Sequence, residues 1–343
     1  LTGLLLVLIG GWGSLSAQSA GSNYSRQVNT LIGTKGVGLT SGYLYPGATY
    51  PYGMVQFTPS YFSKRSGFVI NQLSGGGCEH MGNFPTFPVK GKLKMSPDNI
   101  LNYRINISEE KGHAGYYEAM VQEDIKAKLT VTERTGMASY EYPADQQYGT
   151  VIIGGGISAT PIEQAAIVIT APNKCEGYAE GGNFCGLRTP YKVYFVAEFD
   201  TDALESGTWK RNELKPNTTF AEGEYSGVYF TFDVNKKKNI QYKIGVSYVS
   251  VENARENLKA ENTGWDFLQI QNQAESKWNH YLGKIEVEGT NPDRTTQFYT
   301  HLYRSFIHPN VCSDVNGEYM GADFRVHKSR SKHYTSFSNW DTY

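Results

Sequence analysis

Tyr191-Lys192-Val193-Tyr194-Phe195-Val196-Ala197-Glu198-Phe199 is a run in which aromatic and β-branched residues dominate. Such a run is typical of a strand that is buried on one or both faces. Shorter alternating segments lie on either side of it, separated by turn residues and without a helical pattern. These segments are residues 126–132, 138–142, 228–232 and 242–249. The series extends from about residue 29 to residue 250 and predicts a β-sandwich.

The spacing of apolar residues changes after Ser250. Ser250 is a suitable N-cap for a helix over residues 251–258. A third helix is expected to end near Pro309. The apolar residues expected on one face of the second helix are Phe267, Ile270, Ala274, Trp278 and Tyr281, and those of the third helix are Phe298, Leu302 and Phe306. The predicted order is a sandwich, a helical linker and the start of another domain.

Residues 1–20 resemble part of a secretory signal peptide. The apolar stretch Leu4-Leu5-Leu6-Val7-Leu8-Ile9 is too short to span a bilayer, and small residues that suit cleavage follow it. No cysteine follows directly, so a lipid anchor is not expected, and we predict a secreted or periplasmic protein. The sequence has no initiator Met and stops at Trp340-Asp341-Thr342-Tyr343, which we interpret as a fragment of a longer protein.

The overall charge and the cysteines exclude several classes of function. Lys+Arg 32 against Asp+Glu 33 leaves a net charge of −1, which argues against a nucleic-acid-binding protein. Export makes disulfides possible. Cys175 and Cys185 close a short Gly-rich loop and are the only plausible local pair, although the sequence leaves open whether they are bonded. The other cysteines are Cys78 and Cys312, and no Cys-x-x-Cys pair indicates a zinc site.

The Gly-rich loop of residues 73–80, Leu-Ser-Gly-Gly-Gly-Cys-Glu-His, is the first candidate for a site. It lacks the Lys-Ser/Thr of a phosphate-binding loop, so nucleotide binding is not expected. Its glycines would let the backbone approach a ligand or another domain. Glu79 and His80 could make polar contacts at the rim of a site, or the loop could simply be solvated. A metal site at Cys78-Glu79-His80 is disfavoured because adjacent residues rarely converge on one ion.

The remaining motifs are weaker. No Gly-x-Ser-x-Gly elbow is present, and no pair of carboxylates is distinguished from the others. Asp314 resembles the start of a calcium loop but lacks the later acidic ligand of an EF-hand, so a turn is predicted there. Trp340-Asp341 would place a stacking ring beside a carboxylate acceptor, an arrangement that suits a sugar ligand.

Taken in order, many motifs resemble the N-terminal half of a glycoside hydrolase family 92 exo-α-mannosidase. The resemblance covers nearly all of the mature chain. The matching motifs include Val28-Asn29, Ile32-Gly33-Thr34, Tyr45-Pro46-Gly47-Ala48-Thr49, Pro51-Tyr52-Gly53-Met54-Val55-Gln56, Leu73-Ser74-Gly75, Gly77-Cys78, Phe184-Cys185-Gly186, Ser250-Val251-Glu252-Asn253-Ala254, Gly264-Trp265-Asp266, His308-Pro309-Asn310, Ser313-Asp314-Val315-Asn316-Gly317 and Trp340-Asp341-Thr342.

The resemblance implies a mainly β protein with an N-terminal β-sandwich (residues 21–250), linker helices (251–310) and the truncated start of an (α/α)6 catalytic barrel (311–343). It also implies calcium-dependent, inverting removal of terminal α-linked mannose from glycans. An inverting enzyme needs one carboxylic acid for the leaving oxygen and one carboxylate to activate water. The resemblance places both, and most of the calcium ligands, beyond Tyr343. No catalytic residue is therefore assigned, and the metal ligands are unknown.

The expected contribution of this chain is sugar recognition. By resemblance Asp341, with Trp340 beside it, faces the terminal mannose, and the sandwich loops complete the pocket. The α-1,2-specific members carry His-Thr-His where this chain has Ile70-Asn71-Gln72, so a different leaving-group subsite is expected. The predicted substrate-binding residues are Asp341, Trp340, Gln72, Glu79 and His80. The alternatives are a non-catalytic carbohydrate-binding sandwich and a secreted adhesin-like module.

Overall fold

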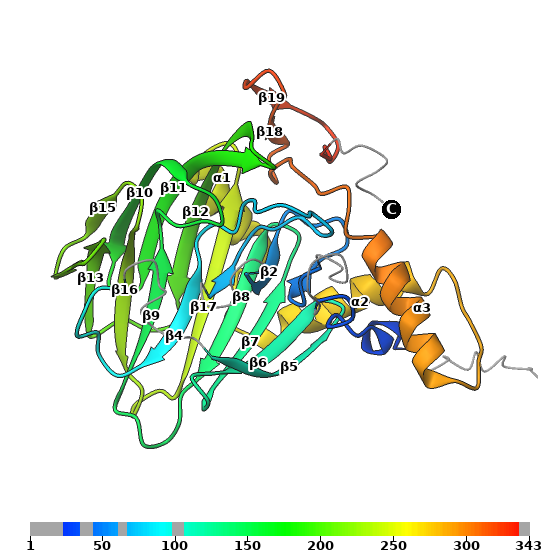
Figure 1. Cartoon of the computed structure of the whole chain (residues 1–343), viewed down its shortest axis with the longest axis horizontal. Coiled ribbons are helices and arrows are strands. Elements are labelled where there is room, and N and C mark those ends of the chain that lie inside the picture. The colour runs from blue at the N-terminus through cyan, green and yellow to red at the C-terminus, as the bar shows by residue number, and fades with distance from the viewer. Residues whose placement is uncertain (1–22, 35–43, 61–66, 98–105, 336–343) are drawn as a thin grey trace, which may run out of the picture.

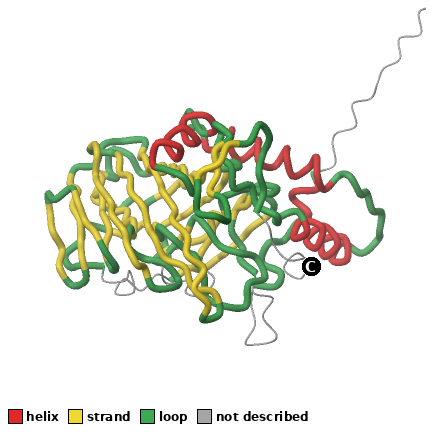
Figure 2. The backbone as a smooth tube through the Cα atoms, turned by 90° about the horizontal axis from the view of Figure 1, so that it is seen from above, coloured by secondary structure: helices red, strands yellow, loops and turns green. Residues whose placement is uncertain are grey.

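The computed structural model describes residues 23–34, 44–60, 67–97 and 106–335. The predicted signal peptide and the Trp340-Asp341 pair lie outside these ranges. Within them, two large antiparallel sheets face each other, two helices lie beside one end of the sandwich, and the last segment rises above it (Figure 1). The view from above shows helices along one side of the strand layers and at one end of them (Figure 2). The predicted sandwich is confirmed.

One sheet contains eight strands of the described part of the chain. In spatial order they are β1 (Ala48–Thr49), β2 (Gln56–Pro59), β3 (Phe68–Val69), β4 (Thr86–Lys90), β9 (Tyr148–Gly154), β16 (Ser226–Asp233), β13 (Glu205–Lys210) and β14 (Glu213–Pro216).

The facing sheet contains nine described strands. In spatial order they are β15 (Phe220–Glu222), β10 (Ile162–Ala171), β11 (Lys174–Phe184), β12 (Leu187–Phe199), β17 (Asn239–Ser247), β8 (Thr135–Glu141), β7 (Ile125–Val131), β6 (Tyr116–Val121) and β5 (Ile107–His113). A separate hairpin follows the helices and consists of β18 (Glu318–Met320) and β19 (Val326–Lys328).

The main core fills the space between the two large sheets. Alternate residues of β12 point into it and have no exposed surface: Val193, Phe195, Ala197 and Phe199. The ring of Phe199 lies 5.0 Å from those of Phe230 and Phe232 on β16 of the other sheet. Because each buried aromatic removes about 150–250 Å² from water, these contacts supply much of the attraction between the layers.

Helix α1 (Val251–Glu261) covers the outer face of the nine-stranded sheet at β12 and β17. Its N-cap is Ser250, whose hydroxyl accepts a hydrogen bond from the Asn253 N–H, as the sequence predicts. Val196 packs against Leu258, which explains why β12 is apolar on both faces. A Cβ at Gly245 would lie 2.6 Å from the carbonyl oxygen of Ala254. The glycine therefore permits the close approach of α1 to the sheet.

The second predicted helix is α2 (Phe267–Leu282), which begins at the N-cap Asp266. Its expected stripe is buried except for Tyr281, which is half-buried. The third is α3 (Pro292–Ser305), and the face that it buries is not the face predicted from the sequence. Phe298, Leu302 and Phe306 are only partly buried, whereas Tyr299 and Tyr303 are fully buried. The cause is packing, because the Tyr303 ring lies 4.5 Å from that of Trp278 on α2.

The short 3-10 helix η1 (Tyr24–Gln27) and the residues after it pack on α2 and α3. The Ser25 N–H donates to Asn279 Oδ1 at 2.7 Å, and the Asn29 N–H donates to Thr300 Oγ1 at 3.0 Å. The N-terminal segment is thus fixed by helices that lie more than 200 residues later in the sequence. None of the helices in the described ranges is long and apolar enough to cross a membrane.

Candidate functional site

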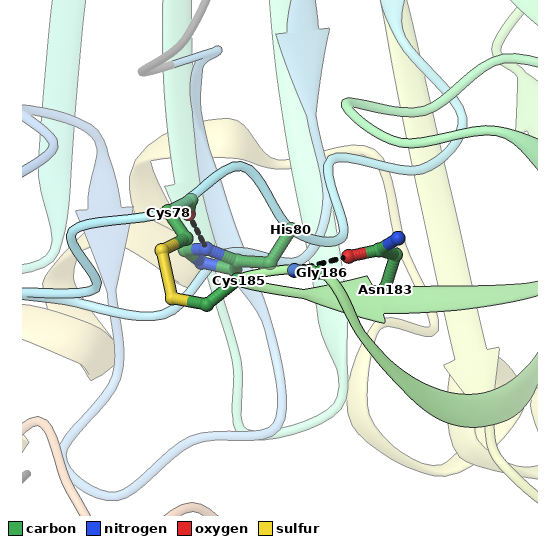
Figure 3. Close-up of a disulfide and its surroundings, with 5 residues drawn as sticks. All are labelled: Cys78, His80, Asn183, Cys185 and Gly186. Atoms are coloured by element: carbon green, nitrogen blue, oxygen red, sulfur yellow. Dashed lines mark hydrogen bonds between the residues drawn. A yellow bond between two sulfur atoms is a disulfide. The ribbon is translucent and has the colours of Figure 1, made fainter.

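The Gly-rich loop of residues 73–80 is held in place by a disulfide that the sequence did not predict. Cys78 is bonded to Cys185, with 5.3 Å between their Cα atoms (Figure 3). Cys185 lies in the turn between β11 and β12, while Cys175 is a free, fully buried thiol. The pairing of Cys175 with Cys185 is therefore wrong. Cys175 points into the core between the sheets, whereas Cys185 lies in the exposed turn.

His80 organises the loop from inside. One ring nitrogen, Nε2, accepts a hydrogen bond from the Leu73 N–H at 2.8 Å, and Nδ1 lies 2.7 Å from the Cys78 carbonyl oxygen, to which it donates. Burial lowers the pKa of His80, which favours the neutral imidazole that this pair of bonds requires. A Cβ at Gly76 would lie 2.8 Å from the ring. The loop is thus wrapped closely around a neutral histidine.

The loop also contacts the segment that follows α3. The Ser74 N–H donates to Nε2 of His308 at 3.2 Å, and Nδ1 of His308 lies 2.9 Å from Asn310 Oδ1. The Asn310 amide donates to the Gly53 carbonyl at 2.7 Å. These bonds join the Gly-rich loop, the turn at residues 50–53 and the chain after α3 into one surface region.

Of the predicted site residues that the structure describes, only Glu79 is exposed. Gln72 is 1% exposed and its backbone N–H donates to Gln56 Oε1 at 3.1 Å. His80 is 3% exposed. Gln72 and His80 therefore shape the loop, and Glu79 is the side chain that it presents to solvent. Trp340 and Asp341 lie outside the described residues.

The turn at Tyr52 connects the sandwich to the chain after α3. The Tyr52 N–H donates to the Phe306 carbonyl at 2.9 Å, and the Val311 N–H donates to the Tyr52 carbonyl at 2.8 Å. Tyr52 has a φ of 56°, in the left-handed region that bulky residues rarely adopt. Strand β2 begins at Gln56, after the turn that residues 50–53 form.

Asp314 begins a turn, as predicted, since the Gly317 N–H donates to its carbonyl oxygen at 2.9 Å. Its side chain is buried where α1 begins. Its carboxylate accepts hydrogen bonds from Ser247 Oγ at 2.6 Å, Asn253 Nδ2 at 2.9 Å and Asn257 Nδ2 at 2.6 Å. Burial raises its pKa, while the donors oppose that rise. All of these partners are neutral side chains of the sandwich and α1. The Asp314 carboxylate thus attaches residues 311–320 to the sandwich. In the described ranges, no set of three or more His, Cys, Asp or Glu is arranged to hold a metal ion.

Two domains of one known family match this chain, one before α1 and one from α1 onward. Residues 27–247 match the glycosyl hydrolase family 92 N-terminal domain, and residues 253–343 match the family 92 catalytic domain. The chain belongs to glycosyl hydrolase family 92. The catalytic-domain match begins within α1, so it includes α2, α3 and the buried Asp314.

Individual relatives agree with the family. An uncharacterized secreted glycosidase of Arthroderma benhamiae is 26% identical, and the match covers 85% of this chain and 42% of that protein. The structure of a family 92 α-mannosidase from Bacteroides thetaiotaomicron superposes with a TM-score of 0.82 at 25% identity, over 94% of this chain and 46% of the other. A family 92 inverting mannosidase of the same organism shares the fold, with a TM-score of 0.73 at 22% identity, over 91% and 44%. The chain spans less than half the length of these relatives.

The features that sequence reasoning missed are pairings between distant residues. The Cys78–Cys185 bond spans 107 positions, and the Ser74–His308 bond spans 234. Four cysteines allow three connectivities, and nothing in their spacing selects one of them. The motifs Phe184-Cys185-Gly186 and His308-Pro309-Asn310 were visible in the sequence, but their contact with the Gly-rich loop was not.

Proposed function

We propose that this chain is part of an inverting exo-α-mannosidase that removes terminal α-linked mannose from glycans. The observation that carries the proposal is the superposition of 94% of the chain on a family 92 α-mannosidase, together with matches to both family domains. That mannosidase has also been solved with mannoimidazole bound. We further propose export, in line with the secreted relative and the signal-like residues 1–20.

In this proposal the chain supplies recognition and not proton transfer. An inverting glycosidase needs an acid and a base separated by about 6.5–9.5 Å, so that water fits between the base and the sugar. We expect both groups beyond Tyr343. Glu79, at the exposed end of the fixed loop, is the side chain we assign to hydrogen bonding with a sugar hydroxyl. Gln72 and His80 act on the sugar through the position of that loop.

Trp340 and Asp341 belong to the same proposal. An ionised Asp341 would accept hydrogen bonds from hydroxyls of the terminal mannose, and the Trp340 ring would offer an apolar surface to the sugar. Hydrogen bonds to a charged acceptor are the strong kind, so an ionised Asp341 would contribute substantially to binding.

We also propose that the enzyme depends on calcium. The described residues do not form a calcium site, since no set of acidic side chains converges among them. Asp314, the buried carboxylate at the domain junction, accepts three hydrogen bonds from neutral side chains of the protein. We therefore assign the ligands to residues outside the described ranges and derive no catalytic step through the ion.

The test is to express the complete gene and to measure mannose release from α-mannosides of each linkage, with and without a calcium chelator. Proton NMR of the first product shows the anomer, and β-mannose is expected. Glu79→Ala should raise KM several-fold with a smaller change in kcat, while Glu141→Ala, an exposed glutamate on β8, should change neither. A folded protein that releases no mannose from any linkage would contradict the proposal.

A non-catalytic carbohydrate-binding sandwich is the alternative function. The two are separated by titrating the 343-residue chain with mannobiose. Tight binding that is lost in Glu79→Ala would favour the alternative, because the enzyme proposal requires the rest of the barrel to complete the pocket.

A further inference from the structure

A trough lies on the outer face of the nine-stranded sheet, beside the start of α2, with a volume of about 590 Å³. Three polar side chains from neighbouring strands form its floor. Lys128 of β7 is paired in register with Ser139 of β8, and Ser139 is paired with Gln241 of β17. Since residues in register point to the same face of a sheet, the three side chains form one row.

The wall of the trough is apolar and comes from the start of α2. It consists of Trp265, Phe267 and Leu268. Leu268 is 65% exposed. One face of the Trp265 ring lies over the ammonium of Lys243 at 4.4 Å, and Lys243 is itself 5% exposed. Trp265 also packs against the cluster of Met137, Phe267 and Ile270, and the exposed part of this half-buried side chain lines the trough.

The floor has hydrogen-bonding capacity that the described protein does not use. Ser139 Oγ donates to Asn239 Oδ1 at 2.7 Å, which leaves the Asn239 NH₂ group available to the trough. The Gln241 side-chain oxygen is shielded from solvent and has no partner among the described residues. Leaving such an acceptor unpaired is costly, and no side-chain hydrogen bond from the described ranges holds the Gln241 amide, so it can turn toward a ligand.

We propose that this trough binds a neutral pyranose ring of a glycan. A pyranose has an apolar face, which suits Trp265 and Leu268, and hydroxyls that both donate and accept, which suit Gln241, Asn239 and the Lys128 ammonium. Lys128 and the exposed Asp266 at the rim carry opposite charges, so the site does not select an anion or a cation. A small number of polar groups beside an apolar wall is the usual composition of a small-molecule site.

The trough is separate from the Gly-rich loop. The disulfide that fixes the loop is at the Cys185 end of β12, whereas Gln241 precedes Tyr242, which pairs with Phe199 at the other end. The 13 residues of β12 span roughly 40 Å. The trough would therefore hold another part of a branched or long glycan, or a second glycan molecule, and raise the local concentration of substrate. The choice of mannosides as the first probe rests on the proposed function.

The binding test uses the 343-residue chain labelled with 5-fluorotryptophan. The fluorine resonance of Trp265 is identified by its loss in Trp265→Phe. Titration with mannotriose at millimolar concentration should shift this resonance progressively to saturation. Gln241→Ala and Lys128→Ala should each weaken the apparent affinity several-fold. Gln273→Ala, an exposed residue further along α2 that does not line the trough, should leave it unchanged.

The possible outcomes separate this inference from the proposed function. A shift with mannotriose and not with maltotriose supports a mannoside site, and a shift with both supports a general pyranose site. No shift of Trp265 with either sugar, in a chain whose other tryptophan resonances remain dispersed, would overturn the inference. Because the readout is binding by this chain, it is independent of whether the complete gene product hydrolyses mannosides.

Discussion

The hydroxyl of Ser247, at the end of β17, donates a 2.6 Å hydrogen bond to the carboxylate of Asp314, which lies after α3. The bond therefore joins the last strand of the sandwich to a residue within the catalytic-domain match. Two asparagines of α1 complete the cage around the carboxylate. The junction between the two parts of the chain is therefore a buried polar network and not a flexible linker.

Removing the carboxylate should weaken that junction. Asp314→Ala leaves three buried donors without their acceptor, so we expect the free energy of unfolding to fall by about 2–4 kcal/mol. The urea midpoint measures this effect. Asp323→Ala is the matched control because Asp323 is exposed, and it should leave the urea midpoint nearly unchanged. Equal midpoints for the two variants would show that the network contributes nothing to stability.

The disulfide prediction concerns both connectivity and stability. Peptide mapping without reductant should recover a fragment that joins Cys78 to Cys185, with Cys175 and Cys312 as thiols. Cys78→Ser should lower the free energy of unfolding by about 2–4 kcal/mol and speed proteolysis within residues 73–80. Cys312→Ser should do neither. A fragment that joins Cys175 to Cys185 would refute this assignment.

His113 should make the chain sensitive to mild acid. Burial, and then the Arg26 charge, lower its pKa from 6.5 to about 4, while Glu275 acts in the opposite direction. The unfolded state therefore binds more protons between these values. The contribution to stability is complete above about pH 6.5 and decreases as the pH falls toward about 4. In His113→Gln the loss of stability over this range should be smaller, as measured by urea midpoints. His301→Gln, at an exposed position on α3, should retain the slope of the parent chain.

Gly115 tests the contact between the β5–β6 turn and α2. It has a φ of +86°, and a Cβ there would lie 2.9 Å from the Cβ of Ala274. Gly115→Ala should cost at least about 1–2 kcal/mol, from the left-handed backbone and from the clash. Adding Ala274→Gly should recover only the part due to the clash. If the double variant is no more stable than the sum of the two single changes predicts, this contact does not explain the cost.

The sequence was sufficient for the local elements and for the family. The alternating segments before residue 250 and the Ser250 N-cap depend on neighbours in the chain, and the structure confirms them. The buried face of α3 could not be predicted, because it is set by packing between Tyr303 and Trp278. The cage of Asp314 could not be predicted either, since its partners lie 57 to 67 positions earlier in the sequence. The site assignments at Glu79, Trp340 and Asp341 remain predictions.

The bond from Asn310 to the Gly53 carbonyl has a consequence for synthesis, because the two residues are 257 positions apart. At translation rates of about 5–20 residues per second, Asn310 is synthesised roughly 10–50 s after Gly53, so their hydrogen bond cannot form before then. The hydrogen bonds of η1 and the residues after it are delayed in the same way, because their partners are on α2 and α3. During that interval the apolar surfaces that later cover Trp278 and Tyr303 are exposed on the nascent chain. Vulnerability to aggregation should therefore end only when α3 and the residues after it have been synthesised.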